Sequence, residues 1–250
     1  MRSKLIVVLS ILSITFMQCK NDTKTTEKTV EKTTEENIEM EEKDNEWKVL
    51  FDGSSTDAFR GYLKDTIHPQ WSIEDGTLAF NPGSEGNKDI ITKEKFTNFT
   101  LSLEWKISEG GNSGIFWGVH ENEKYKEAYM TGPEIQVLDN ERHPDSFVAN
   151  GTHKAGSLYD MIGCPDNVIN PAGEWNLCEI EINQDANYGK VSMNGNKVMS
   201  FPVHGEKWDK MVANSKFTEW EGFAKYRTGH IALQDHSDKV WYRNIKIKKL

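Results

Sequence analysis

The stretch 132–140 carries side chains that could do chemistry inside what would otherwise be a buried strand. Alternation along an extended chain places Glu134 and Gln136 on one face and Ile135 and Val137 on the other. The second face is apolar and belongs to a core. A face with a carboxylate beside an amide is either solvated or lines a polar groove, and other strands repeat this habit. We therefore predict a groove in which Glu134 acts as base or acid, or only hydrogen-bonds a ligand, and Gln136 contacts ligand hydroxyls.

His236 and Glu104 are two more side chains that could transfer a proton. His236 follows Gln234 with matching parity, so both are expected on the same polar face. A histidine there can act as base, acid or hydrogen-bond donor near neutral pH, although a histidine of a surface turn would give the same pattern. Glu104 points away from its apolar neighbours, and its alternative role is a salt bridge to Lys106. We predict Glu134, His236 and Glu104 as the catalytic residues.

Further polar and aromatic residues are predicted to bind the ligand. They are Gln136, Asp139, Asn112, Tyr159, Asp160, Trp117, His143 and Gln234. Asp139 could instead cap the turn after its strand. Asn112 lies in a glycine-rich stretch, 110–114, that is expected to be a turn, where asparagine often serves the backbone. Of two adjacent rings, we assign Phe116 to the core and Trp117 to the groove.

The remaining candidates have open alternatives. Tyr159 could stack on a ligand, hydrogen-bond it, or pack in the core with an exposed hydroxyl. Asp160 could orient a histidine, bind a metal or be a surface acid. His143 lies in a polar loop after the central strand, so a loop role is its first alternative.

Composition and motifs exclude several classes of partner. The chain has 250 residues, a formal net charge of −9 and a pI of about 5.4, without a basic stripe, which argues against nucleic acid. No glycine-rich phosphate loop is present, which argues against a nucleotide. Residues of metal-binding types occur, but without a metal-binding spacing; they are Glu104, Glu134, Asp139, Asp160, His143 and His236. We expect no required cofactor or metal, and a Ca²⁺ held by oxygen ligands stays open.

The N-terminal residues read as an export signal. Arg2 and Lys4 supply the positive start of segment 1–18, and an apolar run follows that is short for a membrane-spanning helix. Residues 16–19 resemble a bacterial lipoprotein lipobox, in which Cys19 is lipidated and becomes the mature N-terminus. The resemblance implies export and a lipid anchor at the bacterial cell envelope. Residues 19–22 resemble the surface-export signals of lipoproteins in the Bacteroidetes group, which implies a place in the outer membrane facing the cell surface. An ordinary secretory peptide is the alternative.

Residues 19–46 are rich in Thr, Glu and Lys and cannot bury enough apolar surface to fold, so we predict a disordered tether. Residues 47–250 form the predicted domain. Many short alternating stretches, with hairpin turns such as Asp75-Gly76, predict an antiparallel β-sandwich. One helix is expected over residues 206–215. Cys164 and Cys178 could form a disulfide or remain free.

Seven segments of the predicted domain, taken in order, resemble the 3-keto-disaccharide hydrolase family of exported bacterial proteins. These segments are 47–53, 111–116, 132–139, 155–160, 173–176, 193–195 and 229–236. The resemblance implies an all-β concanavalin A-like jelly roll of two antiparallel sheets with a concave carbohydrate-binding face. It also implies a carbohydrate substrate, a 3-keto-glycoside or 3-keto-disaccharide, whose glycosidic bond is hydrolysed.

The implied chemistry explains the residue types. A ketone at C3 acidifies the hydrogen on C2, so a base can remove it, the C1 glycoside can leave, and water can add back. Such a site needs a base, a donor to the C3 oxygen and an acid near the leaving oxygen. Two alternatives stay open: a non-catalytic carbohydrate-binding protein at the cell surface, and a laminarinase-like glycoside hydrolase. The latter needs paired carboxylates in an E-x-D-x-x-E strand, and the matching positions here read Glu134, Gln136 and Asp139.

Overall fold

The computed structural model describes residues 46–83 and 88–250. The predicted signal segment, the predicted lipidation site Cys19 and nearly all of the predicted tether lie outside the described residues. Within the described part, no helix is long and apolar enough to cross a membrane.

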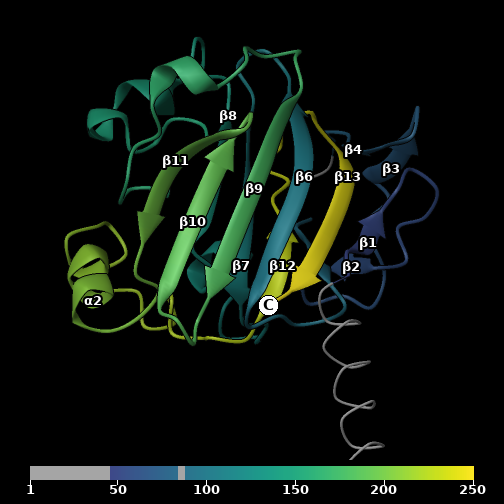
Figure 1. Ribbon diagram of the computed structural model, residues 1–250. Helices are drawn as coiled ribbons and strands as arrows, with labels where there is room; N and C mark the ends of the chain where they lie inside the picture. The colour runs from purple at the N-terminus through teal and green to yellow at the C-terminus, as the bar shows by residue number, and fades with distance from the viewer. Residues whose placement is uncertain (1–45, 84–87) are drawn as a thin grey trace, which may run out of the picture. The chain divides into compact units, whose positions relative to one another are not determined.

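Two antiparallel sheets pack face to face around a common core (Figure 1). The eight-stranded sheet has the order β11-β10-β9-β6-β13-β4-β3, with β1 paired to β13. Its strands are β1 (Lys48–Phe51), β3 (Trp71–Glu74), β4 (Thr77–Phe80), β6 (Phe99–Ile107), β9 (Asn176–Asn183), β10 (Tyr188–Met193), β11 (Asn196–Phe201) and β13 (Val240–Lys249).

The five-stranded sheet has the order β2-β5-β12-β7-β8 and lies behind the larger sheet in Figure 1. Its strands are β2 (Phe59–Gly61), β5 (Ile90–Thr92), β12 (His230–Leu233), β7 (Asn112–Val119) and β8 (Glu134–Leu138). The connections contain the helix α2 (Glu206–Ala213) and the short 3₁₀ helices η1 (Ala128–Met130), η2 (Pro144–Phe147), η3 (Ala149–Gly151) and η4 (Asp166–Val168).

The predicted β-sandwich of two antiparallel sheets is confirmed, and so is one α-helix after the last hairpin of the eight-stranded sheet. The predicted turn at 110–114 is wrong in its second half. Strand β7 already begins at Asn112, because Ser113 and Gly114 pair with β8. Strands β2 and β5 were not predicted, since runs of three residues are too short to show a periodicity.

Trp117 does not face the groove, which corrects the assignment made from the sequence. Phe116 is the cross-strand partner of Glu134, so these two side chains share a face. Trp117 points the other way, into the core between the sheets, where its ring stacks on Phe201 at 5.9 Å. Both rings of β7 are buried, because Phe116 packs in a second apolar cluster with residues such as Ala128.

Cys164 and Cys178 are free thiols in the folded protein. Both are buried, and burial raises the pKa of Cys164 to about 12 and raises that of Cys178 as well. Both thiols therefore remain protonated and unreactive at neutral pH.

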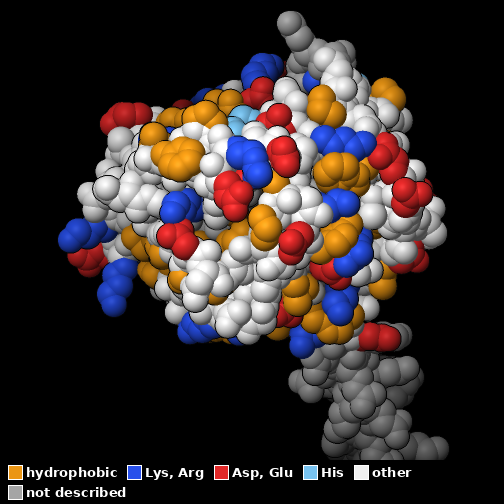
Figure 2. All heavy atoms as spheres, turned by 90° about the horizontal axis from the view of Figure 1, so that it is seen from above, with side chains coloured by type: hydrophobic (Ala, Val, Ile, Leu, Met, Phe, Trp, Pro, Cys, Tyr) orange, Lys and Arg blue, Asp and Glu red, His pale blue; other side chains and the backbone are white. Residues whose placement is uncertain are grey.

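On the face seen in Figure 2, acidic and basic side chains are interspersed, without a continuous basic stripe.

A buried hydrogen-bond chain joins the two sheets through the core. The hydroxyl of Ser113 on β7 donates to the carbonyl of Gln234 (2.7 Å) and accepts from the hydroxyl of Tyr242 on β13 (2.8 Å). Ser113 and Tyr242 are fully buried. This chain therefore fixes the end of β12 just before the segment that carries His236.

We expect Tyr242→Phe to lower the free energy of unfolding by about 1–2 kcal/mol, because the buried Ser113 hydroxyl loses its donor. Urea unfolding measures the change. Tyr188→Phe, which removes a half-buried hydroxyl that donates to Glu181, is the matched control and should cost less. If Tyr242→Phe were as stable as the wild type, the hydrogen bonds between Tyr242, Ser113 and Gln234 would not contribute to stability as we expect.

Candidate active site

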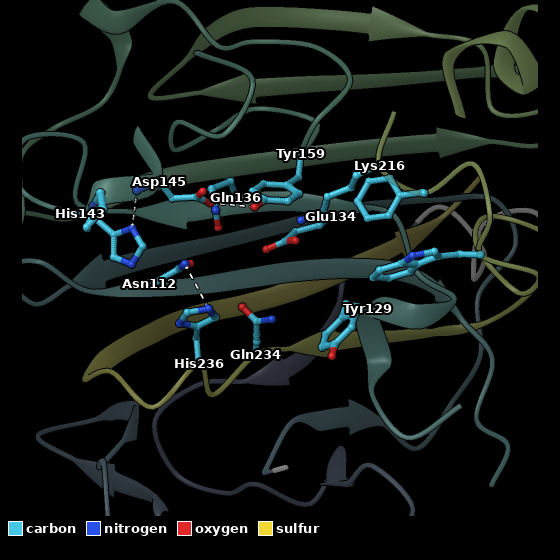
Figure 3. Close-up of a pocket in the computed structure, with 13 residues that line it drawn as sticks. Asn112, Tyr129, Glu134, Gln136, His143, Asp145, Tyr159, Lys216, Gln234 and His236 are labelled. Carbon is cyan, nitrogen blue, oxygen red and sulfur yellow. Dashed lines mark hydrogen bonds between the residues drawn. The ribbon is translucent and has the colours of Figure 1, made fainter. Parts of the chain in front are cut away.

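A cleft with a volume of about 570 Å³ lies over the five-stranded sheet, on the face turned away from the eight-stranded sheet (Figure 3). Strands β7 and β8 and the end of β12 form its floor. Its walls come from the loop after β8 and from the segment after α2. The lining residues are Asn112, Tyr129, Glu134, Gln136, His143, Pro144, Asp145, Tyr159, Lys216, Phe217, Trp220, Gln234 and His236.

Glu134 is the buried acid of this cleft. It is the first residue of β8 and is only 8% exposed, and its carboxyl lies against Gly114 of β7. A Cβ at Gly114 would approach Oε1 of Glu134 to 2.2 Å, so only glycine leaves room for this carboxyl. The residues that the structure describes form no hydrogen bond with it.

Burial controls the charge of Glu134. Loss of hydration raises the pKa of Glu134 to about 8, and the charges of Asp89 and Asp145 add to this effect. The ammonium of Lys216 opposes it. At neutral pH the carboxyl is therefore mostly protonated and able to donate a proton, as in enzymes that keep a general acid in an apolar pocket.

Two histidines line one end of the cleft and have different hydrogen-bond partners. The rings of His143 and His236 are 6.2 Å apart between centroids. Nδ1 of His143 accepts the backbone N–H of Asp145 at 3.2 Å, so its neutral ring carries the proton on Nε2. Nε2 of His236 lies 3.4 Å from the amide nitrogen of Asn112, and Nδ1 of the same ring lies 3.8 Å from Oδ2 of Asp238. His143 thus offers a hydrogen-bond donor to the cleft, and His236 can accept or donate according to its tautomer.

Amide groups supply further hydrogen-bonding capacity on the floor. Oδ1 of Asn112 is buried and has no hydrogen-bond partner among the described residues. Gln136 and Gln234 are also buried and line the cleft between the histidines and Glu134. These side chains suit a ligand with many hydroxyl groups.

The wall after β8 is held by a chain of hydrogen bonds. Tyr159 donates to Asp145 (2.7 Å), and His153 bridges Asp145 (2.9 Å) and Asp160 (2.7 Å). Asp160 then accepts the backbone N–H of Lys216 (2.6 Å). Burial alone would raise the pKa of Asp145, but the bonds from His153 and Tyr159 lower it below its usual value. The chain joins the two walls of the cleft.

The same series of hydrogen bonds holds Lys216 at the end of the cleft opposite the histidines (Figure 3). Its ammonium lies 4.1 Å from the centroid of the Tyr159 ring and 5.4 Å from that of Phe217. Such a cation–π contact holds the charge without neutralising it. Lys216 therefore stays able to bind a ligand oxygen.

Comparison with known proteins shows the family of this chain. Residues 46–248 match the family model described as the 3-keto-alpha-glucoside-1,2-lyase-like domain. The chain belongs to this family. The resemblance predicted from the sequence motifs is confirmed.

Relatives of known sequence or structure extend the match. A 3-keto-disaccharide hydrolase from Bacteroides thetaiotaomicron is 36% identical over 230 residues, which are 81% of this chain and 78% of the relative. A provisionally assigned glycosyl hydrolase of known structure from Parabacteroides distasonis is 30% identical, with a TM-score of 0.75 over 84% of this chain and 96% of that one. A second such structure from the same species is 28% identical, with a TM-score of 0.63 over 82% of this chain and all of that one.

In this member of the family, most of the residues predicted to form the site meet in the cleft. They are Glu134, His236, Gln136, Asn112, Tyr159, His143 and Gln234. Asp160 lies behind the wall and is hydrogen-bonded to His153. Of the three roles considered for Asp160, orienting a histidine is therefore the one that the structure shows. Asp139 lies outside the cleft and caps a turn, accepting the N–H groups of Gly110 (2.7 Å) and Glu141 (3.0 Å).

Glu104 is not brought to the cleft. It lies on β6 of the eight-stranded sheet and forms a salt bridge to Arg243, with contacts of 2.8 and 2.5 Å, and a hydrogen bond from Asn244 (2.7 Å). The salt-bridge alternative therefore describes it, with Arg243 in place of the expected Lys106. In the described ranges, no group of three or more His, Cys, Asp or Glu side chains is arranged to hold a metal ion.

Several lining residues were missed in the sequence. They are Tyr129, Pro144, Asp145, Lys216, Phe217 and Trp220. The spacing of Phe217, Trp220 and Phe223 by three residues was a usable signal, because it repeats an aromatic ring once per turn in the segment after the helix. Nothing in the local pattern of Lys216 indicated its place.

Glu134 should make the stability of the protein depend on pH. Its carboxyl has its usual pKa of 4.5 in the unfolded chain and about 8 in the folded protein. Between these values the folded protein binds more protons, so its free energy of unfolding falls as the pH rises. As the pH rises from about 5 to about 8, the free energy of unfolding of Glu134→Gln should therefore increase by several kcal/mol relative to that of the wild type, at about 1.4 kcal/mol per pKa unit. Urea unfolding across this range measures the difference, and a pH-independent difference would contradict the prediction.

Lys216→Gln should raise the pKa of Glu134 further, because the ammonium is the neighbouring charge that favours the carboxylate. Carbon-detected NMR titration of labelled glutamate side chains measures this pKa, with Glu134→Gln identifying the signal. Lys225→Gln removes an exposed charge that does not line the cleft and should leave the titration unchanged. An equal shift in both lysine variants would show only a general effect of net charge.

Proposed function

We propose that this domain cleaves the glycosidic bond of 3-keto-glycosides, including 3-keto-disaccharides, by elimination followed by hydration. One observation carries the proposal: a buried Glu134, whose pKa is raised to about 8, shares a cleft with two histidines, His143 and His236. The elimination needs a base, a donor and an acid, and these three groups match them. Membership of the 3-keto-alpha-glucoside-1,2-lyase-like family supports the same substrate class.

The elimination step follows from these roles. Nε2 of His236 takes the proton from C2, and the electron pair forms an enolate whose C3 oxygen accepts a hydrogen bond from Nε2–H of His143. The C1–O bond then breaks, and Glu134 gives its proton to the leaving oxygen. The products are the free leaving group and a sugar with a C1–C2 double bond conjugated to the ketone.

Hydration reverses the roles. The Glu134 carboxylate takes a proton from water as the hydroxide adds to C1, and the imidazolium of His236 returns a proton to C2. The net reaction is hydrolysis, and both groups regain their starting states. Because the ketone is already present in the substrate, we propose that no redox cofactor is needed.

The two alternatives fit the cleft less well. A laminarinase-like mechanism needs paired carboxylates at C1, but Gln136 is an amide and Asp139 caps a turn outside the cleft. Asp145 does line the cleft, yet both of its oxygens are bonded, to His153 and Tyr159. A protein that only binds carbohydrate gains nothing from burying a carboxyl without a partner, which costs stability.

The proposed place of action is the cell envelope. Export and lipid attachment at Cys19 rest on the sequence of the first residues alone. A surface position would suit a protein that receives sugars from outside the cell.

The test compares a 3-keto-disaccharide with its unoxidised parent, using the full chain. We expect sugar release from the ketone only, and a loss of kcat of about 100-fold or more in Glu134→Gln and in His236→Ala. Glu181→Gln removes a carboxylate that is paired with Lys190 on the eight-stranded sheet and should retain activity.

Solvent deuterium separates the mechanisms. In D₂O, elimination and hydration leave deuterium at C2 of the released keto sugar beyond the exchange seen without enzyme, whereas direct displacement at C1 does not. Cleavage of the unoxidised parent would instead support the laminarinase-like reading. Binding of both sugars without turnover would leave a carbohydrate-binding protein.

A further inference from the structure

We propose that the cleft binds its substrate in one direction only, with the keto ring at the histidine end and the leaving group on an aromatic platform formed by Tyr129, Phe217 and Trp220. The direction rests on the proposed elimination. The platform itself rests on geometry alone.

The aromatic platform is built from two segments that are far apart in the sequence. The rings of Tyr129 and Trp220 are 5.7 Å apart, and those of Trp220 and Phe217 are 5.1 Å apart in an edge-on arrangement. Behind them, Phe223 stacks on Phe217 at 3.9 Å. Tyr129 and Trp220 are only half-buried, so part of their ring surface faces the cleft.

Backbone bonds hold the platform in place. The N–H of Ala224 donates to the carbonyl of Thr131 (2.8 Å), which ties the segment after α2 to the end of η1. Within that segment, the N–H of Trp220 donates to the carbonyl of Phe217 (2.9 Å). The rings are therefore preorganised and need no rearrangement to receive a flat ligand.

The two ends of the cleft differ in chemistry. Figure 3 shows His143, Asn112 and His236 at one end and Tyr129 with Lys216 at the other. Glu134 lies between these ends, and the polar end has no aromatic side chain apart from its imidazoles. A substrate with one polar reacting ring and one flat ring would match this order.

The order of the reacting atoms sets the direction. In the elimination, the C3 oxygen contacts the donor His143, C2 contacts the base His236, and the leaving oxygen on C1 contacts the acid Glu134. These groups follow one another from the histidine end toward the middle. The leaving group attached to this oxygen must therefore extend past Glu134, away from the histidines and toward Tyr129 and Trp220.

The platform defines the class of leaving group. The partly exposed rings of Tyr129 and Trp220 favour flat groups with an apolar face, which both an aryl ring and a second pyranose ring offer. The cleft volume of about 570 Å³ lies within the usual range for pockets that enclose a ligand of drug size, about 300–1,000 Å³. A small alkyl leaving group such as methoxy would not reach the platform.

The test measures kcat/KM of the full chain for the methyl, phenyl and glucosyl members of one 3-keto-α-glucoside series. Each variant is compared with the wild type on the same substrate, so that intrinsic leaving-group reactivity cancels. Trp220→Ala should lower kcat/KM for the phenyl and glucosyl substrates by about three- to tenfold, the size of one aromatic contact. The methyl substrate should change less than about twofold. Unequal losses for phenyl and glucosyl would show which flat ring the platform prefers, and a selective loss of either supports the proposal.

Trp220→Leu and Tyr129→Leu are control variants that keep an apolar side chain at each position and are therefore less disruptive to folding. They should show the same selective loss of kcat/KM for the phenyl and glucosyl substrates. An equal loss for all three substrates in every variant would overturn the platform. A selective loss for the phenyl and glucosyl substrates in His143→Ala, but not in Trp220→Ala, would reverse the direction and also overturn the proposal.

Failure of the aromatic platform can be distinguished from failure of the proposed elimination. If no 3-keto-glycoside is turned over, the elimination fails, and binding of unoxidised phenyl α-glucoside then judges the platform alone. Weaker binding to Trp220→Ala than to the wild type, with methyl α-glucoside unaffected, would support a platform for flat rings. Equal binding of phenyl α-glucoside to both proteins would overturn it.

Discussion

The burial of one carboxyl between two strands is the constraint on which the site depends. Glu134 can occupy its position only because Gly114 on the neighbouring strand has no side chain. The same burial removes water from the carboxyl and raises its pKa to about 8, which turns an ordinary acid into a proton donor at neutral pH. Strand pairing therefore determines both where this group lies and which protonation state it has.

The rest of the fold supports that position from two directions. Below the floor, Tyr242 of the eight-stranded sheet bonds Ser113, which in turn bonds the carbonyl of Gln234. Above the floor, His153 ties Asp145 to Asp160, and Asp160 accepts the backbone N–H of Lys216, which joins the two walls. The first set of bonds links the strands that carry the polar side chains, and the second links the loops that form the walls.

The difference between the two histidines shows how backbone geometry assigns chemistry. Both are ordinary loop or turn histidines in the sequence, and either could have been acid, base or donor. The N–H of Asp145, at the start of a 3₁₀ turn, occupies Nδ1 of His143 and leaves a proton on its other nitrogen. Asn112 instead approaches Nε2 of His236. Two side chains of the same type thus have different surroundings at one end of the cleft.

The sequence by itself determined what depends on local periodicity and short motifs. Alternation placed Glu134 and Gln136 on a polar face opposite Ile135 and Val137, glycine turns predicted the hairpins of the sandwich, and ordered motifs identified the family. Alternation says which side chains share a face of a strand, because that follows from backbone geometry alone.

Only the tertiary structure decided which of those faces forms the cleft. Glu104 and Glu134 alternate in the same way, yet one lies on the eight-stranded sheet beside Arg243 and the other in the cleft. Phe116 and Trp117 are both buried, so parity could not say which one faces the core between the sheets. Lys216 reaches the site through a bond to Asp160 across a separation of 56 residues. Such contacts arise from how the sheets and loops pack, which no local pattern in the chain records.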